Sequence, residues 1–110
     1  MKLISRKEEL VLLSIWKLRD NAYGVTITDQ LAKTTGRYWS IGAVYDVLDR
    51  LTRKALVAAS ASDPLPERGG KSKRLYRITK DGHQALEEIR EIHDTMWSDL
   101  PESALEFENP

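Results

Sequence analysis

The segment 40–54, SIGAVYDVLDRLTRK, constrains the fold of this chain more than any other part of it. Ser40 can accept a hydrogen bond from a free backbone N–H of the following turn, as an N-cap residue does, and Trp39 before it can pack against Val44. At about 100° per residue, the apolar side chains of the segment fall on one stripe: Ile41, Val44, Leu48 and Leu51. The pattern predicts a helix that buries one face and leaves the other free.

The free face of this helix begins with two very small residues, Gly42 and Ala43. They would let the helix N-terminus approach a phosphate group or the floor of the DNA major groove, and Tyr45 at the border could reach the sugar-phosphate backbone. An ordinary amphipathic helix on a protein surface is the alternative that the stripe alone leaves open. If this helix recognises DNA, the residues expected to contact the DNA are Ser40, Gly42, Ala43, Tyr45, Asp46, Asp49 and Arg50.

Two carboxylates on the free face, Asp46 and Asp49, need an explanation because they repel phosphate. At a spacing of four residues they can pair with Arg50 and Arg53 and orient these side chains. An aspartate can also accept a hydrogen bond from the amino group of cytosine. The acidic residues are therefore compatible with DNA recognition.

A helix is also expected over residues 6–19, which contain no Gly or Pro and many strong helix formers. Its apolar residues form two faces, one made of Val11, Ile15 and Leu18 and the other of Leu12, Leu13 and Trp16. A helix with two apolar faces is usually buried on two sides. The second face either lies at the centre of the domain or meets another chain.

A second, short helix is expected from about residue 25 to residue 35, with Gly36 at its end. The four residues 36–39 separate it from the helix that starts after Ser40. A helix, a four-residue turn that contains Gly and a further helix form a helix-turn-helix arrangement. The segment 40–54 would be its recognition helix.

The chain beyond this helix favours a β-hairpin. Residues 55–61 indicate a short strand, and residues 74–79 are richer in β-forming residues. The connection between them carries Pro, Gly and several cations, which could contact phosphate or the minor groove in a winged helix. The wing residues expected to contact DNA are Arg68, Gly69, Lys71, Lys73 and Arg74. A basic loop that is merely solvated is the alternative.

Thr79 can cap a final helix that runs to about residue 100, before Pro101. Apolar residues and His93 recur along it at spacings of three and four, a seam that is too short for an independent coiled coil but sufficient for a dimer arm. His93 is expected to pack in this seam, because no convincing set of metal ligands accompanies it. The residues expected at the dimer interface are Leu12, Trp16, Leu86, Ile89, Ile92, His93, Met96, Trp97 and Leu100.

The charge of the chain is distributed very unevenly. Its 110 residues, 41% of them apolar, allow one domain with a modest core. The net charge is zero, but residues 1–80 carry 16 Lys and Arg against 8 Asp and Glu, a net of +8, while residues 81–110 carry 1 against 9, a net of −8. This division favours a basic DNA-binding domain at 1–80, a dimerisation helix at 81–100 and an acidic, loosely ordered tail at 101–110.

The composition offers little for catalysis. The chain has no Cys and two His, so thiolate chemistry and Cys-based zinc sites are absent, and no pattern typical of a catalytic triad or of paired carboxylates is legible. We therefore expect a protein that is not an enzyme and that holds no cofactor or metal. No segment approaches the roughly 20 apolar residues of a membrane span, so a soluble, cytoplasmic protein without a membrane partner is expected.

Taken together, these elements resemble the PadR family of bacterial transcriptional regulators over roughly residues 8–98. The matching stretches are ELVLLSI at 9–15, AYGVTI at 22–27, SIGAVYDVLDRL at 40–51, ERGGKSKRLYRIT at 67–79 and Gly82. Lys80 and Asp81 stand where members of the family often have Pro and Glu, which affects only the start of the final helix. The chain is similar to the short form of the family, in which one C-terminal helix makes the dimer.

The resemblance implies a homodimer that binds a palindromic operator in double-stranded DNA and represses transcription more often than it activates it. It also implies that a planar aromatic effector could bind at the dimer interface, where Trp16 and Trp97 could supply stacking faces. The alternative is that both tryptophans form the dimer core. A winged-helix protein-interaction module without specific DNA binding is the competing function, and the charge of +8 on residues 1–80 argues against it.

Overall fold

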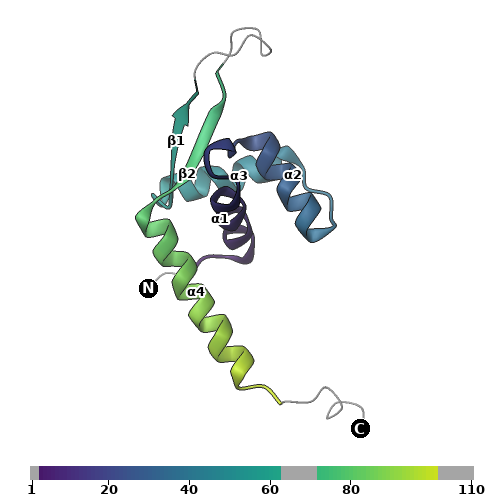
Figure 1. Cartoon of the computed structure of the whole chain (residues 1–110), viewed down its shortest axis with the longest axis vertical. Helices are drawn as coiled ribbons and strands as arrows, with labels where there is room; N and C mark the ends of the chain where they lie inside the picture. Colours follow the sequence, from purple (N-terminus) through teal and green to yellow (C-terminus); the bar gives the residue numbers. More distant parts are fainter. Residues whose placement is uncertain (1–2, 63–71, 102–110) are drawn as a thin grey trace.

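The computed structural model describes residues 3–62 and 72–101, and within these ranges the chain forms four α-helices and one two-stranded antiparallel hairpin. In chain order the elements are α1 (Arg6–Leu18), the short 3-10 helix η1 (Arg19–Asn21), α2 (Gly24–Thr35), α3 (Ile41–Arg53), β1 (Val57–Ala61), β2 (Arg74–Ile78) and α4 (Lys80–Ser98). Figure 1 shows α1, α2 and α3 gathered together, with the hairpin projecting on one side and α4 extending away on the other. The mainly helical winged helix-turn-helix with a long C-terminal helix is confirmed.

Hydroxyl side chains start three of the helices. Ser40 Oγ and Thr79 Oγ1 each accept a backbone N–H of the helix that follows, both at 3.1 Å, so both predicted N-caps are confirmed. At α1, Ser5 and Glu8 form a reciprocal capping box that the sequence argument did not identify. Each helix of the helix-turn-helix region therefore has a sharply defined beginning or end, including α2, which stops at Gly36 with the left-handed φ of 68°.

The hairpin is joined to the helices at its base. β1 and β2 pair in antiparallel register from Val57 opposite Ile78 to Ala61 opposite Arg74. The backbone N–H of Tyr76 in β2 donates to the carbonyl of Ala22, between η1 and α2, at 2.8 Å. Tyr76 and Ala22 are both buried, so this end of the wing belongs to the hydrophobic core.

The core lies where α1 meets α2, α3, β2 and α4. α3 contributes Val44, Val47, Leu48 and Leu51, all buried, and α2 contributes Ile27 and Leu31. Full burial of an aliphatic side chain of this size stabilises a fold by about 1.5–3 kcal/mol. The predicted stripe of α3 needs one correction, because Ile41 in its first turn is 44% exposed whereas Val47, which was not predicted, is buried.

The central position of α1 corrects part of the predicted dimer interface. Leu12 is completely buried in the core of its own chain, so it cannot contact a second copy in this conformation. Leu86 and Ile89, in the first half of α4, are also buried against their own chain. By contrast, Leu13 and Trp16 remain 43% and 50% exposed. Apolar periodicity had identified the buried faces correctly but assigned some of them to the wrong partner.

An ion pair between a buried carboxylate and a half-exposed ammonium group connects the start of α1 to the end of α3. Lys54 Nζ lies 2.7 Å from Glu8 Oε2, and the Glu8 side chain is almost completely buried. Burial acts to raise the pKa of the Glu8 carboxyl, but the hydrogen bond and charge of Lys54 and the hydrogen bonds from Ser5 outweigh it, so this pKa lies below its ordinary value. Glu8 is therefore ionised at neutral pH and holds the two helices together.

α4 packs closely against the turn after α3 through Gly82. A Cβ atom at this position would overlap the carbonyl oxygen of Leu56 and the Cγ1 atom of Ile78. Ala55, next to this contact, has a left-handed φ of 59°, and Thr79 Oγ1 donates to its carbonyl at 2.8 Å. The first turn of α4 is thus fixed on the body of the protein.

Candidate nucleic-acid interface

The exposed side of α3 carries every residue that the sequence predicted for DNA recognition. All of these residues are exposed in the structure: Ser40, Gly42, Ala43, Tyr45, Asp46, Asp49 and Arg50. Nothing lies within 4 Å of where a Cβ atom of Gly42 would be, so the start of the helix offers an open backbone surface. The structure therefore gathers these residues on one accessible surface, where a polyanion could reach the N-terminal half of α3.

Tyr45 connects this surface to α2. Its ring lies directly against Gly24, at a position that a Cβ atom on Gly24 would occupy, and its side chain is 39% exposed. Gly24 is therefore needed for close packing between the start of α2 and the phenol of Tyr45. In the sequence Gly24 is expected only in a turn, although a glycine beside a predicted helix start also permits close approach of another side chain.

Tyr76 lies beneath the same region and is buried. Burial raises the pKa of its phenol, Arg74 acts in the opposite direction, and the negative charge that Tyr45 or Asp49 can carry raises it further. The phenol of Tyr76 is therefore neutral at neutral pH and belongs to the hydrophobic core.

The predicted ion pairs within α3 do not form. Among the described residues, Asp46 does not pair with Arg50, and Asp49 does not pair with Arg53. An exposed pair of this kind gains little because the attraction is screened by water and ordering two side chains costs entropy. Both guanidinium groups are consequently available to an external anion.

In the described part of the wing, Lys73 and Arg74 each lie near an aromatic ring, while the guanidinium group of Arg77 lies 3.5 Å from Asp20 Oδ1. The Lys73 Nζ atom lies 4.3 Å from the ring centroid of Tyr23, and the Arg74 guanidinium carbon lies 5.9 Å from that of Tyr76. The first contact holds Lys73 beside the start of α2, whereas the second lies within β2. The other predicted wing residues, Arg68, Gly69 and Lys71, lie outside the described residues, as do residues 102–110 of the predicted tail.

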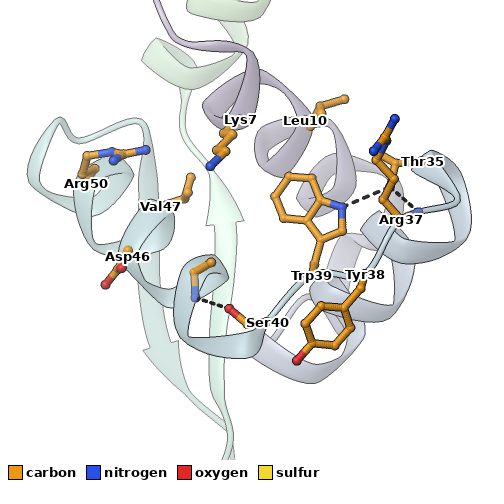
Figure 2. A pocket seen from close by; sticks show the side chains of 11 residues that line it. Lys7, Leu10, Thr35, Arg37, Tyr38, Trp39, Ser40, Asp46, Val47 and Arg50 are labelled. Carbon is orange, nitrogen blue, oxygen red and sulfur yellow. Dashed lines mark hydrogen bonds between the residues drawn. The ribbon is translucent and has the colours of Figure 1, made fainter.

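A hollow of about 690 Å³ adjoins α3 on the side of α1. Figure 2 shows Trp39 forming one wall of this space, with Lys7 reaching in from α1 and Val47 on the opposite side. The indole Nε1 of Trp39 donates to Thr35 Oγ1 at 3.0 Å. From the sequence, Trp39 is expected only to pack against Val44, and this hollow is not predicted.

The predicted effector residues Trp16 and Trp97 lie far apart in one chain. Trp16 contacts the ring of His83, with centroids 4.6 Å apart, near the start of α4. Trp97 lies fourteen residues further along the same helix, which corresponds to about 21 Å. One chain therefore cannot place both rings on a single small ligand, and a common site would require a second copy.

The remaining predicted interface residues lie towards the free end of α4. Met96, Trp97 and Leu100 are 65%, 73% and 52% exposed. Ile92 and His93 are half-buried, and His93 Nε2 lies 3.3 Å from Glu9 Oε1 on α1. Their role in a dimer stays a prediction.

Two further features are absent from the described ranges, a membrane-spanning helix and a cluster of metal-binding side chains. None of the helices there has the length and apolar character needed to cross a membrane. Nor do residues 3–62 and 72–101 bring together three or more side chains of His, Asp or Glu in a way that could hold a metal ion.

Helices α2 and α3 with the hairpin define a winged helix-turn-helix protein. The sequence profile of the PadR-like family of transcriptional regulators matches residues 12–88, and the chain belongs to this family. A comparison with curated protein sequences gives no match.

Solved structures agree with this assignment. A PadR-like transcriptional regulator from Bacillus cereus has a similar fold, with a TM-score of 0.69 and 23% identity over 83% of this chain and 84% of the other. A PadR family regulator from Eggerthella lenta gives 0.66 and 27% over 84% and 79%, and one from Clostridium difficile gives 0.65 and 27% over 88% and 100%.

Proposed function

We propose that this chain is a sequence-specific DNA-binding regulator that represses transcription in the cytoplasm as a homodimer on a palindromic operator. The observation that carries the proposal is the exposed surface of α3, on which Arg50 and Arg53 have no ion-pair partner among the described residues. The hairpin adds Lys73 and Arg74, at the end of the strand pairing that lies away from the helices. A helix surface with free cations and a basic hairpin next to it is suited to the major groove and its flanking phosphates.

The wing and α3 would have different roles in DNA binding. Cations of the wing, among them Arg68, Lys71 and Lys73, would supply salt-dependent affinity for any DNA sequence. Side chains of α3 would set register and sequence preference through contacts with base edges and the nearest phosphates. The α3 residues proposed for this second role are Ser40, Gly42, Ala43, Tyr45 and Arg50.

The homodimer is supported by the apolar residues that the free end of α4 exposes. Met96, Trp97 and Leu100 lie within the segment 81–100, and a monomer would leave all three in water. Pairing of two such ends would cover them and would present two copies of α3 to one DNA duplex. Half-sites about 34–36 Å apart, one helical turn, are the spacing that a two-fold symmetric dimer of this class reads.

The most specific part of the proposal is that a planar aromatic effector binds at the dimer interface. Trp97 is the more accessible of the two candidate rings, whereas one edge of Trp16 is occupied by His83. Quenching of tryptophan fluorescence by a cationic planar dye, lost in a Trp97→Ala variant that still dimerises, would support this role. An unchanged titration in that variant would leave Trp97 as dimer core only.

The decisive experiment is selection of genomic DNA fragments by the purified full chain at about 150 mM salt, where non-specific binding is already weak. Recovery of a palindrome is the expected outcome, and a reporter placed behind it would give the sign of regulation. Recovery of no sequence by a folded dimer would contradict the proposal and favour a winged-helix module that binds another protein.

A further inference from the structure

Tyr38 lies in the turn between α2 and α3 and is the most exposed of the large apolar side chains that the structure describes, at 89%. The other three tyrosines of the chain have neighbours. Tyr76 is buried, the ring of Tyr45 lies against α2, and the ring of Tyr23 lies beside a cation of the wing. By contrast, no described residue forms a hydrogen bond, an aromatic contact or a cation–π contact with the side chain of Tyr38. Both its ring and its hydroxyl are therefore available to an external partner.

The backbone on both sides of Tyr38 is fixed. Gly36 ends α2 with a left-handed φ of 68°, and the backbone N–H of Arg37 donates to Thr35 Oγ1 at 3.3 Å. On the other side, Trp39 packs against the hydrophobic core, and its Nε1 atom donates to the same hydroxyl at 3.0 Å. Because the turn is already ordered, a partner of Tyr38 would have only the side chain to immobilise.

Tyr38 borders the exposed surface of α3. It lies two residues before the N-cap Ser40, so the Cα atoms of these two residues are at most about 7.6 Å apart. Figure 2 shows the rings of Trp39 and Tyr38 pointing in opposite directions, which separates the ring that packs on the core from the exposed one. A duplex that met the first turn of α3 would therefore also meet the phenol of Tyr38.

The position of Tyr38 outside the helix indicates which part of the duplex it would meet. The first turn of a recognition helix faces base edges in the major groove, and the groove is bordered by the sugar-phosphate backbone. Tyrosine hydroxyls are among the usual hydrogen-bond donors to DNA phosphates. The phenol offers one donor for a phosphate oxygen and an apolar face for the adjoining sugar. Position and chemistry thus both match the backbone of DNA.

We propose that Tyr38 binds a phosphate of the DNA strand that borders the groove at the N-terminal end of α3, with its hydroxyl as the donor. This inference rests on the proposed DNA-binding function and adds a contact from the turn to those proposed for α3 and the wing. Every step of a duplex carries a phosphate, so the contact has no sequence preference of its own and fixes how α3 lies along the groove. Because a phenol brings no positive charge, it adds affinity without adding to the salt dependence.

Removal of the hydroxyl is the first test. Tyr38→Phe should weaken binding to the selected operator and to unrelated DNA alike by about tenfold, the usual effect of losing one hydrogen bond to a charged group. Tyr23→Phe removes the same atom from a ring that already lies beside Lys73 and should leave both affinities unchanged. Urea denaturation should show wild-type stability for Tyr38→Phe, because the lost atom lies on an exposed side chain. Equal affinities of wild type and Tyr38→Phe, equal losses in the two variants, or a change in sequence preference would overturn the proposal.

Neutral methylphosphonates, placed one at a time in an operator half-site, identify the phosphate. Each replaces a charged oxygen of one phosphate by a methyl group. At the phosphate that Tyr38 contacts, the loss of affinity should be about tenfold smaller in Tyr38→Phe than in the wild type, because the hydrogen bond is already missing. Identical losses in the two proteins at every phosphate would show that Tyr38 contacts none of them and would overturn the proposal.

Salt dependence separates this contact from those of the cations. Plots of log affinity against log salt concentration should be parallel for the wild type and Tyr38→Phe, whereas loss of a cation that contacts phosphate lowers the slope by about one. A lower slope in Tyr38→Phe would mean that the substitution had displaced a cation, and it would contradict a neutral donor at this position.

The same measurements keep this inference distinguishable from the proposed function. A protein that selects no operator but binds unrelated duplex DNA at about 50 mM salt, and binds it about tenfold less tightly as Tyr38→Phe, would support the phosphate contact and overturn only sequence-specific regulation. Normal operator selection with equal affinities for wild type and Tyr38→Phe would overturn only the contact. Absence of binding to any duplex would overturn both.

Discussion

Helices α3 and α4 are both amphipathic and both begin at a hydroxyl N-cap, yet their exposed surfaces differ. The exposed side of α3 bears glycine, alanine, tyrosine and charged residues, opposite a stripe that is buried from Val44 to Leu51. α4 is buried only along its first half, and its free end exposes Met96, Trp97 and Leu100. The surface of α3 suits a hydrated polyanion, whereas the end of α4 suits another apolar surface. The two helices thus show that a similar apolar period can be covered by its own chain along a whole helix or along only part of one.

The largest expected effect comes from breaking the attachment of α4. Gly82→Ala places a Cβ atom against the carbonyl oxygen of Leu56, which cannot rotate away, so we expect a loss of about 3 kcal/mol in the free energy of unfolding. Urea denaturation measures it. Gly42→Ala is the matched control on α3, where the added methyl group meets nothing within 4 Å. It should change stability by about 0.5 kcal/mol or less, and similar losses for both variants would contradict this account.

The second prediction concerns the free end of α4. Trp97→Ala should weaken the homodimer about 30-fold, corresponding to about 2 kcal/mol for an exposed aromatic residue that becomes an interface hot spot. Sedimentation equilibrium over a concentration series measures the change. Glu91→Ala, an exposed change on the same helix, serves as control. An unaltered dimerisation constant for Trp97→Ala would contradict the proposed role of the end of α4 in the dimer.

The third prediction tests the surface of α3. Arg50→Ala should weaken binding to the selected operator by about 1–3 kcal/mol and relax the sequence preference at one position of each half-site. Arg90→Ala removes the same charge from α4 and should have little effect. Fluorescence anisotropy with the operator and with single-base variants distinguishes the two. Equal losses for every DNA sequence would place Arg50 on the backbone instead of on a base.

The fourth prediction addresses how α3 is tied to α1. The pKa of Glu8 is lowered in the folded protein, so its ionised form contributes stability that is fully present above its ordinary pKa of 4.5 and is lost as pH falls through the folded value. Glu8→Gln should therefore destabilise the protein by about 1 kcal/mol at pH 7, because Lys54 can regain water once unpaired, and by less at pH 3. Urea denaturation at both pH values, with exposed Glu87→Gln as control, measures the difference. A constant difference between pH 7 and pH 3 would argue against the ion pair as its origin.

The smallest effect is expected in the wing. Lys71→Ala should weaken binding to all DNA sequences alike and reduce the salt dependence by about one ion. Affinities measured for operator and unrelated DNA at several salt concentrations test this. A change in sequence preference would show that Lys71 reads bases, and the division between α3 and the wing would then be wrong.

Local signals in the sequence were sufficient for most of the fold. Ser40 and Thr79 mark helix starts, Gly36 marks a helix end, and the period of apolar residues locates α1, α3 and α4 because each signal depends on neighbours within one or two turns. The spacing of the apolar residues could not predict whether Leu12 is buried by its own chain or by a second copy. That outcome depends on three-dimensional packing around α1.

The candidate site was accessible to sequence reasoning only in part. The exposed residues of α3 could be predicted because they share one helix face. The hollow beside Trp39 could not be predicted in this way. Two of its lining residues, Lys7 and Arg50, are 43 residues apart in the sequence, and they line one space only when α1 packs beside α3. Contact between Gly24 and Tyr45 likewise depends on how α2 and α3 cross. The predicted pairing of Asp46 with Arg50 failed for another reason, since spacing permits an exposed ion pair without making it favourable.

The hydrogen bond from Tyr76 to the carbonyl of Ala22 has a consequence for how such proteins can diverge. It fixes the base of the hairpin to the helices, and the pairing of β1 with β2 carries this register outward. Insertions or deletions between residues 62 and 72 would therefore change the reach of the wing without altering the bundle. Doubling the length of a loop costs only about 0.6 kcal/mol in closure entropy. Evolution can thus change the length of this connection while the exposed surface of α3 stays the same.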